Sequence, residues 1–222
     1  MAIPNPFYAI YEGAAILAGA TPIYVPCTAH TNYLPDFDAI GPKEWNRCQL
    51  LFLCSPNNPT GAVLPKSAFE KALELSDKYG FIIASDECYS EIYFDEQNRP
   101  SGLLEVCLEL GRPEFKNCLV LNSLSKRSSI PGLRSGFIAG DAEIVASLYK
   151  YRSYHGCAIP YPIQAASVLA WEDEDHVTKN RNYYKEKLQA VHAVLHSDPS
   201  DRKLQYVLPA ASFFLWAETP SD

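Results

Sequence analysis

Short apolar runs alternate with longer amphipathic stretches along most of the chain, and turn residues separate them. The apolar run 50–55 predicts a buried strand, and 65–80 predicts the helix after it, with apolar side chains on one face and Gly80 as its stop. Further strands are expected at "FIIASDE" (81–87), "CLVLNSL" (118–124) and "GFIAG" (136–140). This alternation is typical of an α/β fold, a mostly parallel sheet with flanking helices.

Three more helices are predicted in the second half, over 142–154, 161–173 and 174–197. The last is long and rich in Lys, Arg and Glu, which fits either a solvated face or a helix that bridges two domains. Beyond it, "KLQYVLPAASFFLWAET" begins a new strand pattern. We therefore expect a large domain over 1–172, an interdomain helix over 173–197 and the start of a small α+β domain over 198–222.

Composition narrows the classes of function. With 222 residues and 47% hydrophobic content the chain can bury a core, and 19 basic against 26 acidic residues disfavour nucleic acid and acidic membranes as partners. Seven scattered cysteines without a C-x-x-C pair indicate reduced thiols and no metal site. The start lacks the pattern of a signal peptide, and no apolar run reaches the roughly 18 residues of a membrane span, so a cytoplasmic protein is expected.

Chemically active side chains follow the predicted strands. Ligands of open α/β sheets bind at the carboxyl ends of the strands. The residues expected there are Asn58, Asp86, Tyr89, Ser123, Ser125, Lys126 and Arg134. A lysine amine can form a Schiff base with an aldehyde cofactor, and a carboxylate can pair with a pyridinium nitrogen. An arginine with neighbouring serine hydroxyls suits a phosphate. Together these groups describe a site for pyridoxal phosphate.

Each of these residues also has an ordinary structural interpretation. A lysine in a serine-rich loop is usually a surface residue, Asp86 could cap a helix or a turn, and Asn58 could form a turn ahead of Pro59. Taken singly, these interpretations are favoured. The set favours the cofactor site, because packing alone does not explain why so many polar groups converge on one edge.

Three motifs then carry a resemblance to a known family. "SPNNPTG", "SDECYSEIYF" and "SLSKRSSIPGLRSGF" occur in order and at suitable spacing, and with them the chain resembles the class I/II pyridoxal-phosphate aminotransferases of fold type I. The resemblance implies an amino-acid substrate, a 2-oxo acid substrate and a homodimer in the full-length enzyme. It also implies that Lys126 is the Schiff-base lysine and the base that moves the substrate's Cα proton.

The same resemblance assigns the cofactor contacts. It implies that Asp86 pairs with the pyridine nitrogen and that Asn58 and Tyr89 hold the ring's O3′ atom. The phosphate falls to Ser123, Ser125 and Arg134. Tyr8, in "NPFYAIY", lies where the family places an aromatic ring stacked on the cofactor. The alternative for Tyr8 is a core or loop-anchoring tyrosine.

The sequence around Lys126 also resembles one particular subfamily. "NSLSKRSSIPGLRSGFIAGD" and the "YRSYHG" loop resemble the bacterial N-succinyl-diaminopimelate aminotransferases of lysine biosynthesis, which use glutamate and 2-oxoglutarate. Aminotransferases for aspartate, alanine or aromatic amino acids share the general motifs. Arg152 and His155 could contact a distal substrate carboxylate, or they are a surface arginine and a structural histidine.

Expected parts of the family pattern are missing. The glycine-containing phosphate loop, an N-terminal tyrosine that reaches the partner subunit and the arginine that clamps the substrate α-carboxylate have no counterpart here. We therefore expect a fragment or a truncated gene product that binds the cofactor weakly. Three hypotheses stay open: an aminotransferase, another enzyme of this fold such as a β-lyase or decarboxylase, and a protein that is not an enzyme, either a truncated or decayed copy or a cofactor-fold module of a regulator.

Overall fold

The computed structural model describes residues 1–156, 158–197 and 204–219, and its centre is a six-stranded sheet. The strand order is β2-β1-β3-β4-β5-β6, in which β1 to β5 run parallel and β6 is antiparallel to β5. The strands are β1 (Ala2–Asn5), β2 (Ile23–Pro26), β3 (Leu50–Cys54), β4 (Ile82–Asp86), β5 (Cys118–Ser123) and β6 (Gly136–Gly140). The mostly parallel sheet with flanking helices that the sequence predicts is confirmed.

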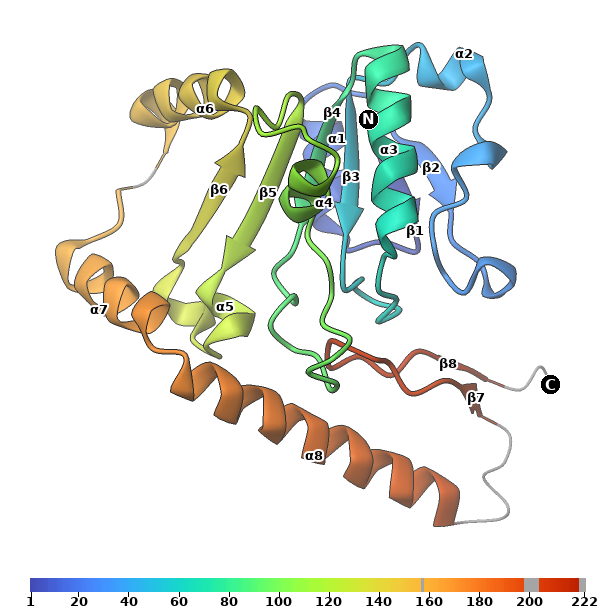
Figure 1. The fold of residues 1–222 in the computed structure, drawn as a ribbon, viewed down its shortest axis with the longest axis vertical. Helices are drawn as coiled ribbons and strands as arrows, with labels where there is room; N and C mark the ends of the chain where they lie inside the picture. The colour runs from blue at the N-terminus through green and yellow to red at the C-terminus, as the bar shows by residue number, and fades with distance from the viewer. Residues whose placement is uncertain (157, 198–203, 220–222) are drawn as a thin grey trace.

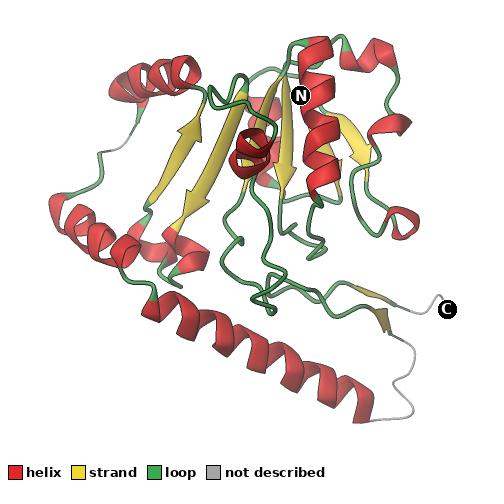
Figure 2. Cartoon of the chain, viewed as in Figure 1, coloured by secondary structure: helices red, strands yellow, loops and turns green. Residues whose placement is uncertain are grey.

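Helices lie on both faces of this sheet, α3 and α4 in front of it and α1 behind it (Figures 1 and 2). The helices are α1 (Ile10–Leu17), α2 (Pro42–Trp45), α3 (Lys66–Tyr79), α4 (Leu103–Glu109), α5 (Leu124–Arg127), α6 (Ala142–His155), α7 (Tyr161–Glu172) and α8 (Asp175–Ser197). The chain also forms three short 3-10 helices among the described residues, η1 (Ala29–Thr31), η2 (Phe37–Ala39) and η3 (Pro131–Leu133). The long helix α8 runs past the carboxyl ends of β3 and β5, so the loops that follow these strands lie between α8 and the sheet (Figure 1).

The main core lies between the sheet and α3. Leu51 and Leu53 of β3 and Phe69 of α3 are completely buried in it. Gly80 ends α3 in the left-handed conformation at φ +78, as the sequence predicts, because glycine has no Cβ to oppose that backbone. A smaller cluster on the other face joins Ile3, Tyr11 and Cys54. The two clusters enclose the central strands from both sides.

The first two strands do not follow from the hydrophobic pattern. β1 has four residues and includes Pro4, and proline is unusual inside a strand because it cannot donate a ladder hydrogen bond. β1 pairs along its length with β2, but it meets β3 only at Ala2↔Leu51. The burial of Ala2 and Ile3 secures the strand despite its proline.

The C-terminal residues form a small separate sheet. β7 (Gln205–Tyr206) pairs antiparallel with β8 (Ala217–Glu218). The segment between these strands packs on the loop after β4, where Ala211 forms an isolated antiparallel bridge with Tyr93 and the amide of Ser212 donates to the carbonyl oxygen of Ile92 at 2.6 Å. The expected strand pattern near the end is therefore present. Residues 198–203, which open the predicted small domain, lie outside the described residues.

Candidate active site

The carboxyl ends of β3, β4 and β5 lie next to one another. Cys54 is paired with Asp86, and Asp86 with Leu121, so the loops after these strands begin side by side. Figure 1 shows these ends directed toward α8 and the segment between β7 and β8. The predicted residues from three separate stretches of sequence thus reach one edge of the sheet.

Lys126 lies on α5, a single turn that starts where β5 stops. Ser123 ends the strand and caps the turn, because its hydroxyl oxygen accepts a hydrogen bond from the amide of Ser125 at 3.1 Å. The amine of half-buried Lys126 lies 5.7 Å from the ring centre of Tyr89 and 5.2 Å from that of Phe213. The lysine therefore faces the loop after β4 and not open solvent.

Asp86 is the last residue of β4, and both of its oxygens are engaged. Oδ2 accepts a hydrogen bond from the hydroxyl of Tyr11 at 2.6 Å, and Oδ1 accepts one from the amide of Cys88 at 3.1 Å. Tyr11 is buried and stacks on Phe52 at 4.7 Å between ring centres. Burial raises the pKa of Tyr11, so its hydroxyl keeps its proton and acts as a donor at neutral pH. The carboxylate is held in one orientation.

Tyr89 forms the wall of the site between Asp86 and the C-terminal segment. It is 6% exposed, and its ring meets those of Phe213 and Phe214 edge-on at 5.3 and 5.2 Å. Burial raises its pKa, so the phenol stays protonated and can donate to an anionic oxygen. The sequence pattern does not assign these phenylalanines to the site, and their only local signal is the apolar pair "FF" in an expected strand.

Tyr8 and Asn58 lie on the flanks of this group. Tyr8 is 48% exposed and touches Tyr11 edge-on at 5.9 Å, which places it one contact away from Asp86. Half-buried Asn58 lies in the loop after β3, where its neighbour Asn57 donates to the hydroxyl of Thr60 at 2.8 Å. Tyr8 is thus accessible to a ligand, and Asn58 lies in a loop with an internal hydrogen bond.

Of the predicted phosphate contacts, the two serines lie together, and the guanidinium of Arg134 has a different partner. The hydroxyls of Ser123 and Ser125 lie 2.9 Å apart, and the hydroxyl of Ser123 donates to the carbonyl of Ser135 at 3.1 Å. Arg134 precedes Ser135, but its guanidinium is exposed and donates to the carbonyl oxygen of Pro131 at 2.9 Å. The serines share one corner of the site, whereas contact of Arg134 with a phosphate stays a prediction.

Arg152 and His155 belong to α6, which follows β6 at the end of the sheet opposite to α5 (Figure 1). The ring of His155 stacks on Tyr151 at 5.1 Å. Within this chain neither residue lies at the edge that carries Lys126, so their contact with a substrate stays a prediction.

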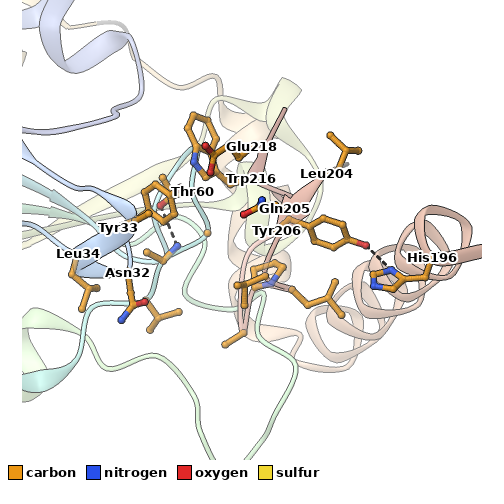
Figure 3. Close-up of a pocket in the computed structure, with 18 residues that line it drawn as sticks. Asn32, Tyr33, Leu34, Thr60, His196, Leu204, Gln205, Tyr206, Trp216 and Glu218 are labelled. Carbon is orange, nitrogen blue, oxygen red and sulfur yellow. Dashed lines mark hydrogen bonds between the residues drawn. The ribbon is translucent and has the colours of Figure 1, made fainter. Parts of the chain in front are cut away.

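A cavity of about 790 Å³ lies beside the site, between the loop after β3 and the C-terminal segment. In Figure 3 Tyr33, Thr60 and Trp216 border one side, while His196 and Tyr206 meet on the other. Gly61, at φ +74, faces this segment, and a Cβ there would stand 2.9 Å from that of Pro209. Glycine therefore permits the close approach of the segment to the loop after β3.

Similarity to known proteins agrees with this geometry. The family model of aminotransferase class I and II matches residues 1–222. The chain belongs to this aminotransferase family. The resemblance that the three motifs carry is thereby confirmed.

Relatives of this aminotransferase chain are about twice its length. It is 34% identical over 218 residues to LL-diaminopimelate aminotransferase of Nitratidesulfovibrio vulgaris, which covers 97% of this chain and 54% of the relative. An aminotransferase structure from Neisseria meningitidis has a TM-score of 0.90 and 49% identity, covering 99% of this chain and 54% of that one. A probable N-succinyldiaminopimelate aminotransferase from Thermus thermophilus has a TM-score of 0.87 and 26% identity, covering 99% of this chain and 56% of that one. The chain thus spans about half of these relatives.

The donor set of this aminotransferase chain suits pyridoxal phosphate. The set consists of the amine of Lys126, which lies 5.7 Å from the ring centre of Tyr89, the protonated phenol of Tyr89, and the oriented carboxylate of Asp86 at the neighbouring strand end. These are the groups required for an aldehyde, a pyridinium nitrogen and a phenolate oxygen. Among the described residues there is no group of three or more His, Cys, Asp or Glu suited to a metal ion, and no helix is both long and apolar enough to cross a membrane.

Proposed function

We propose that this chain carries the cofactor-binding part of a pyridoxal-phosphate-dependent aminotransferase, which moves an amino group between an amino acid and a 2-oxo acid. The observation that carries the proposal is the placement of Lys126 against Tyr89, with Asp86 oriented at the neighbouring strand end. Family membership supports the same reaction. The chain spans 54% of the length of its Nitratidesulfovibrio vulgaris relative, so the activity of the longer protein belongs to this proposal.

Each site residue has its own proposed role toward the cofactor. When bound, pyridoxal phosphate supplies an aldehyde and an electron-accepting ring. The amine of Lys126 would hold the aldehyde carbon of the bound cofactor, and it would also be the base that moves the proton at the substrate's Cα atom. Asp86 keeps a proton on the ring nitrogen, and the hydrogen bond from Tyr11 prevents that carboxylate from turning away. Tyr89 donates toward the ring oxygen, with Asn58 as the second proposed contact.

The corner formed by Ser123 and Ser125 is the proposed phosphate site, with Arg134 as its cation. Reaching a phosphate requires the guanidinium of Arg134 to leave the carbonyl of Pro131. Because Arg134 is exposed, breaking this hydrogen bond costs little free energy, since water can hydrate the freed carbonyl of Pro131. Tyr8 is the proposed ring that stacks on the cofactor.

Diaminopimelate derivatives are the proposed substrates, with glutamate as amino donor and 2-oxoglutarate as its product. Two relatives support this class, since one is named for LL-diaminopimelate and another for N-succinyldiaminopimelate. Aspartate, alanine and aromatic amino acids are the alternatives. The proposed place of action is the cytoplasm.

A second copy of the chain is the proposed macromolecular partner. Large side chains on α6 and α7 reach solvent, among them Tyr149 (79% exposed), Tyr154 (84%) and Leu169 (68%). Contiguous apolar patches on a protein surface mark interaction sites, and we propose that these side chains belong to one. A homodimer would cover them.

The decisive experiment is covalent trapping of the cofactor. The chain is incubated with pyridoxal phosphate, reduced with borohydride and mapped by mass spectrometry. We expect the reduced adduct at Lys126 and its loss in Lys126→Ala, whereas Lys116→Ala, a change at an exposed lysine, leaves it intact. Equal labelling of many lysines, or an adduct that survives Lys126→Ala, would overturn the assignment.

Product analysis then separates the reaction classes. With N-succinyl-LL-diaminopimelate and 2-oxoglutarate, an aminotransferase forms glutamate at the expense of 2-oxoglutarate. A β-lyase instead releases ammonia with an amino acid that carries a leaving group on Cβ. Labelling of Lys126 without either product would contradict turnover by this chain alone and favour a cofactor-binding part that needs the rest of the longer protein for activity.

A further inference from the structure

The turn that carries Lys126 cannot hold its shape by itself. α5 has four residues, and its main-chain bond from the amide of Ser128 to the carbonyl of Leu124 measures 3.1 Å. An isolated turn of helix is unstable in water, because fixing its backbone costs more than one hydrogen bond returns. The direction of the Lys126 side chain must therefore depend on contacts from other parts of the chain.

Asn180 of α8 supplies the most direct of these contacts. Its side-chain nitrogen donates to the main-chain oxygen of Lys126 at 3.0 Å and to that of Arg127 at 3.1 Å. The hydroxyl of Ser129 donates to the amide oxygen of Asn180 at 2.7 Å. Carbonyl groups at the end of a helix lack intrahelical partners, so this amide satisfies two of them at once.

Neighbouring contacts secure the rest of the turn. The guanidinium of Arg127, which is 5% exposed, donates to the carbonyl of Ala170 at 2.7 Å and pairs with Glu174. His176 lies 2.8 Å from the hydroxyl of Ser128 through its Nε2 atom. These contacts hold the side chains after Lys126, whereas Asn180 alone among the described residues holds the carbonyl of Lys126 through a side-chain hydrogen bond.

The same face of α8 also holds the wall that the lysine faces. Tyr184 lies one turn after Asn180, and its ring stacks on that of Phe213 at 4.9 Å between centres. Phe213 in turn lies 5.2 Å from the amine of Lys126. One helix face thus contacts both the peptide at the base of the lysine and the ring at its tip.

We propose that Asn180 is a positioning residue, which directs the amine of Lys126 toward Tyr89 and Phe213 by holding the carbonyls of the Lys126 turn. This inference rests on the proposed function for its chemical meaning, since it assumes that Lys126 binds the cofactor. Its structural part, the hold on α5, stands independently of the cofactor. α8 therefore links the lysine to the C-terminal segment through Asn180 and Tyr184.

The first test measures the hold itself by hydrogen exchange. Asn180→Asp keeps the shape of the side chain but replaces the donor nitrogen with an oxygen that repels the carbonyls. We expect exchange at residues 124–130 to accelerate about tenfold, since two hydrogen bonds are lost. Asn182→Asp, the same change at an exposed position of α8, should leave these residues unchanged. Unchanged exchange in Asn180→Asp, or the same change in both variants, would overturn the proposal.

The second test asks whether the hold matters for the lysine. Pyridoxal phosphate is titrated into the full chain, and the visible absorbance of the bound cofactor gives the half-saturating concentration. We expect this concentration to rise about tenfold in Asn180→Ala, which adds no charge, and to stay constant in Asn182→Ala. Asn180→Ala also serves if Asn180→Asp does not fold. A merely structural role predicts faster exchange with unchanged cofactor binding, and that result would refute a positioning role.

The two tests fail in different ways. Absence of an absorbance band and of a borohydride adduct in the unsubstituted chain would contradict the proposed function. Hydrogen exchange at residues 124–130 would still decide whether Asn180 holds the turn. A cofactor that binds normally to the unsubstituted chain and to both Asn180 variants would contradict the positioning role alone.

Discussion

The centre of the sheet and its outer strip differ in how far their side chains are buried. In β3 and β4, Leu51, Leu53 and Ile83 are fully buried between helices. The outer strip, defined as β6, α6 and α7, has one buried residue in its elements, Ser167, among the described residues. Phe137 and Ile138 of β6 are 45% and 39% exposed. The centre is buried within this chain, whereas the strip exposes large apolar side chains to solvent.

This difference explains where the site lies. The proposed catalytic side chains follow the central strands, whose buried residues fix the positions of the strand ends. Asp86 and Lys126 are each held by side-chain contacts from distant parts of the sequence, Tyr11 and Asn180. Rigid strands with covered faces can orient reacting groups, while a strip with open faces is better suited to association.

The largest effect is expected from a cavity in the centre. Phe81 is fully buried and stacks on Trp45 at 5.4 Å, so Phe81→Ala should lower the free energy of unfolding by about 3–5 kcal/mol. Tyr149→Ala in the outer strip, where the side chain is 79% exposed, should change it by less than about 0.5 kcal/mol. Urea denaturation of both variants measures the contrast. Similar losses in the two variants would contradict the distinction between the regions.

The same contrast sets how much of the fold could be predicted from the sequence. β3, β4 and β5 are recognisable because burial on both faces demands continuous apolar runs. β1 and β2 are short and contain proline, so their strand pairing depends on contacts with the rest of the sheet and not on local pattern. Helix α3 is recognisable from its apolar face and from Gly80.

The next effect concerns the hydroxyl of Tyr11. Tyr11→Phe keeps the ring on Phe52 but removes the hydrogen bond to Asp86, and hydrogen bonds to charged groups contribute about 1.5–3 kcal/mol. We expect a loss of that order in the free energy of unfolding and weaker binding of pyridoxal phosphate. Tyr24→Phe is the matched control, since exposed Tyr24 pairs with Glu12 and should matter far less. Equal effects would show that burial does not set the value of this bond.

Tyr11 also shows what the sequence of the site could not reveal. Lys126, Asp86 and Asn58 stand in short sequence motifs, so the local sequence is enough to propose them as site residues. Tyr11 lies 75 residues from Asp86, and Asn180 lies 54 from Lys126, so their roles arise only when the chain folds. A local signal for Tyr11 is its spacing of three residues from Tyr8, which brings the two rings into edge-on contact at the start of α1.

A pH-dependent effect is expected from Glu87 in the buried centre. Burial raises the pKa of this carboxyl group to about 6, although the amide of Leu103 and the hydroxyl of Ser85 donate to it. A raised pKa means that the folded state binds the proton more tightly, so stability falls as pH rises from the ordinary value of 4.5 through 6. The loss amounts to roughly 2 kcal/mol.

Denaturation at several pH values tests this contribution. Glu87→Gln cannot titrate, so its free energy of unfolding should lack that decline of roughly 2 kcal/mol between pH 4.5 and 7. Glu74→Gln, a change at an exposed position of α3, should retain the decline. An unchanged pH profile in Glu87→Gln would mean that other groups produce the effect.

The smallest effect on stability is expected in the outer strip, where the effect on association should be largest. Leu169 of α7 is 68% exposed, so Leu169→Ser should alter the free energy of unfolding of a single chain by no more than about 0.5 kcal/mol. If a second copy covers the strip, the same change removes apolar area from that interface, and sedimentation should show a higher dissociation constant. Val194→Ser on α8, at 69% exposure, is the control outside the strip. Unchanged association in Leu169→Ser would place the dimer contact elsewhere, whereas weaker association at unchanged stability would show that the strip is completed by assembly and the centre by folding.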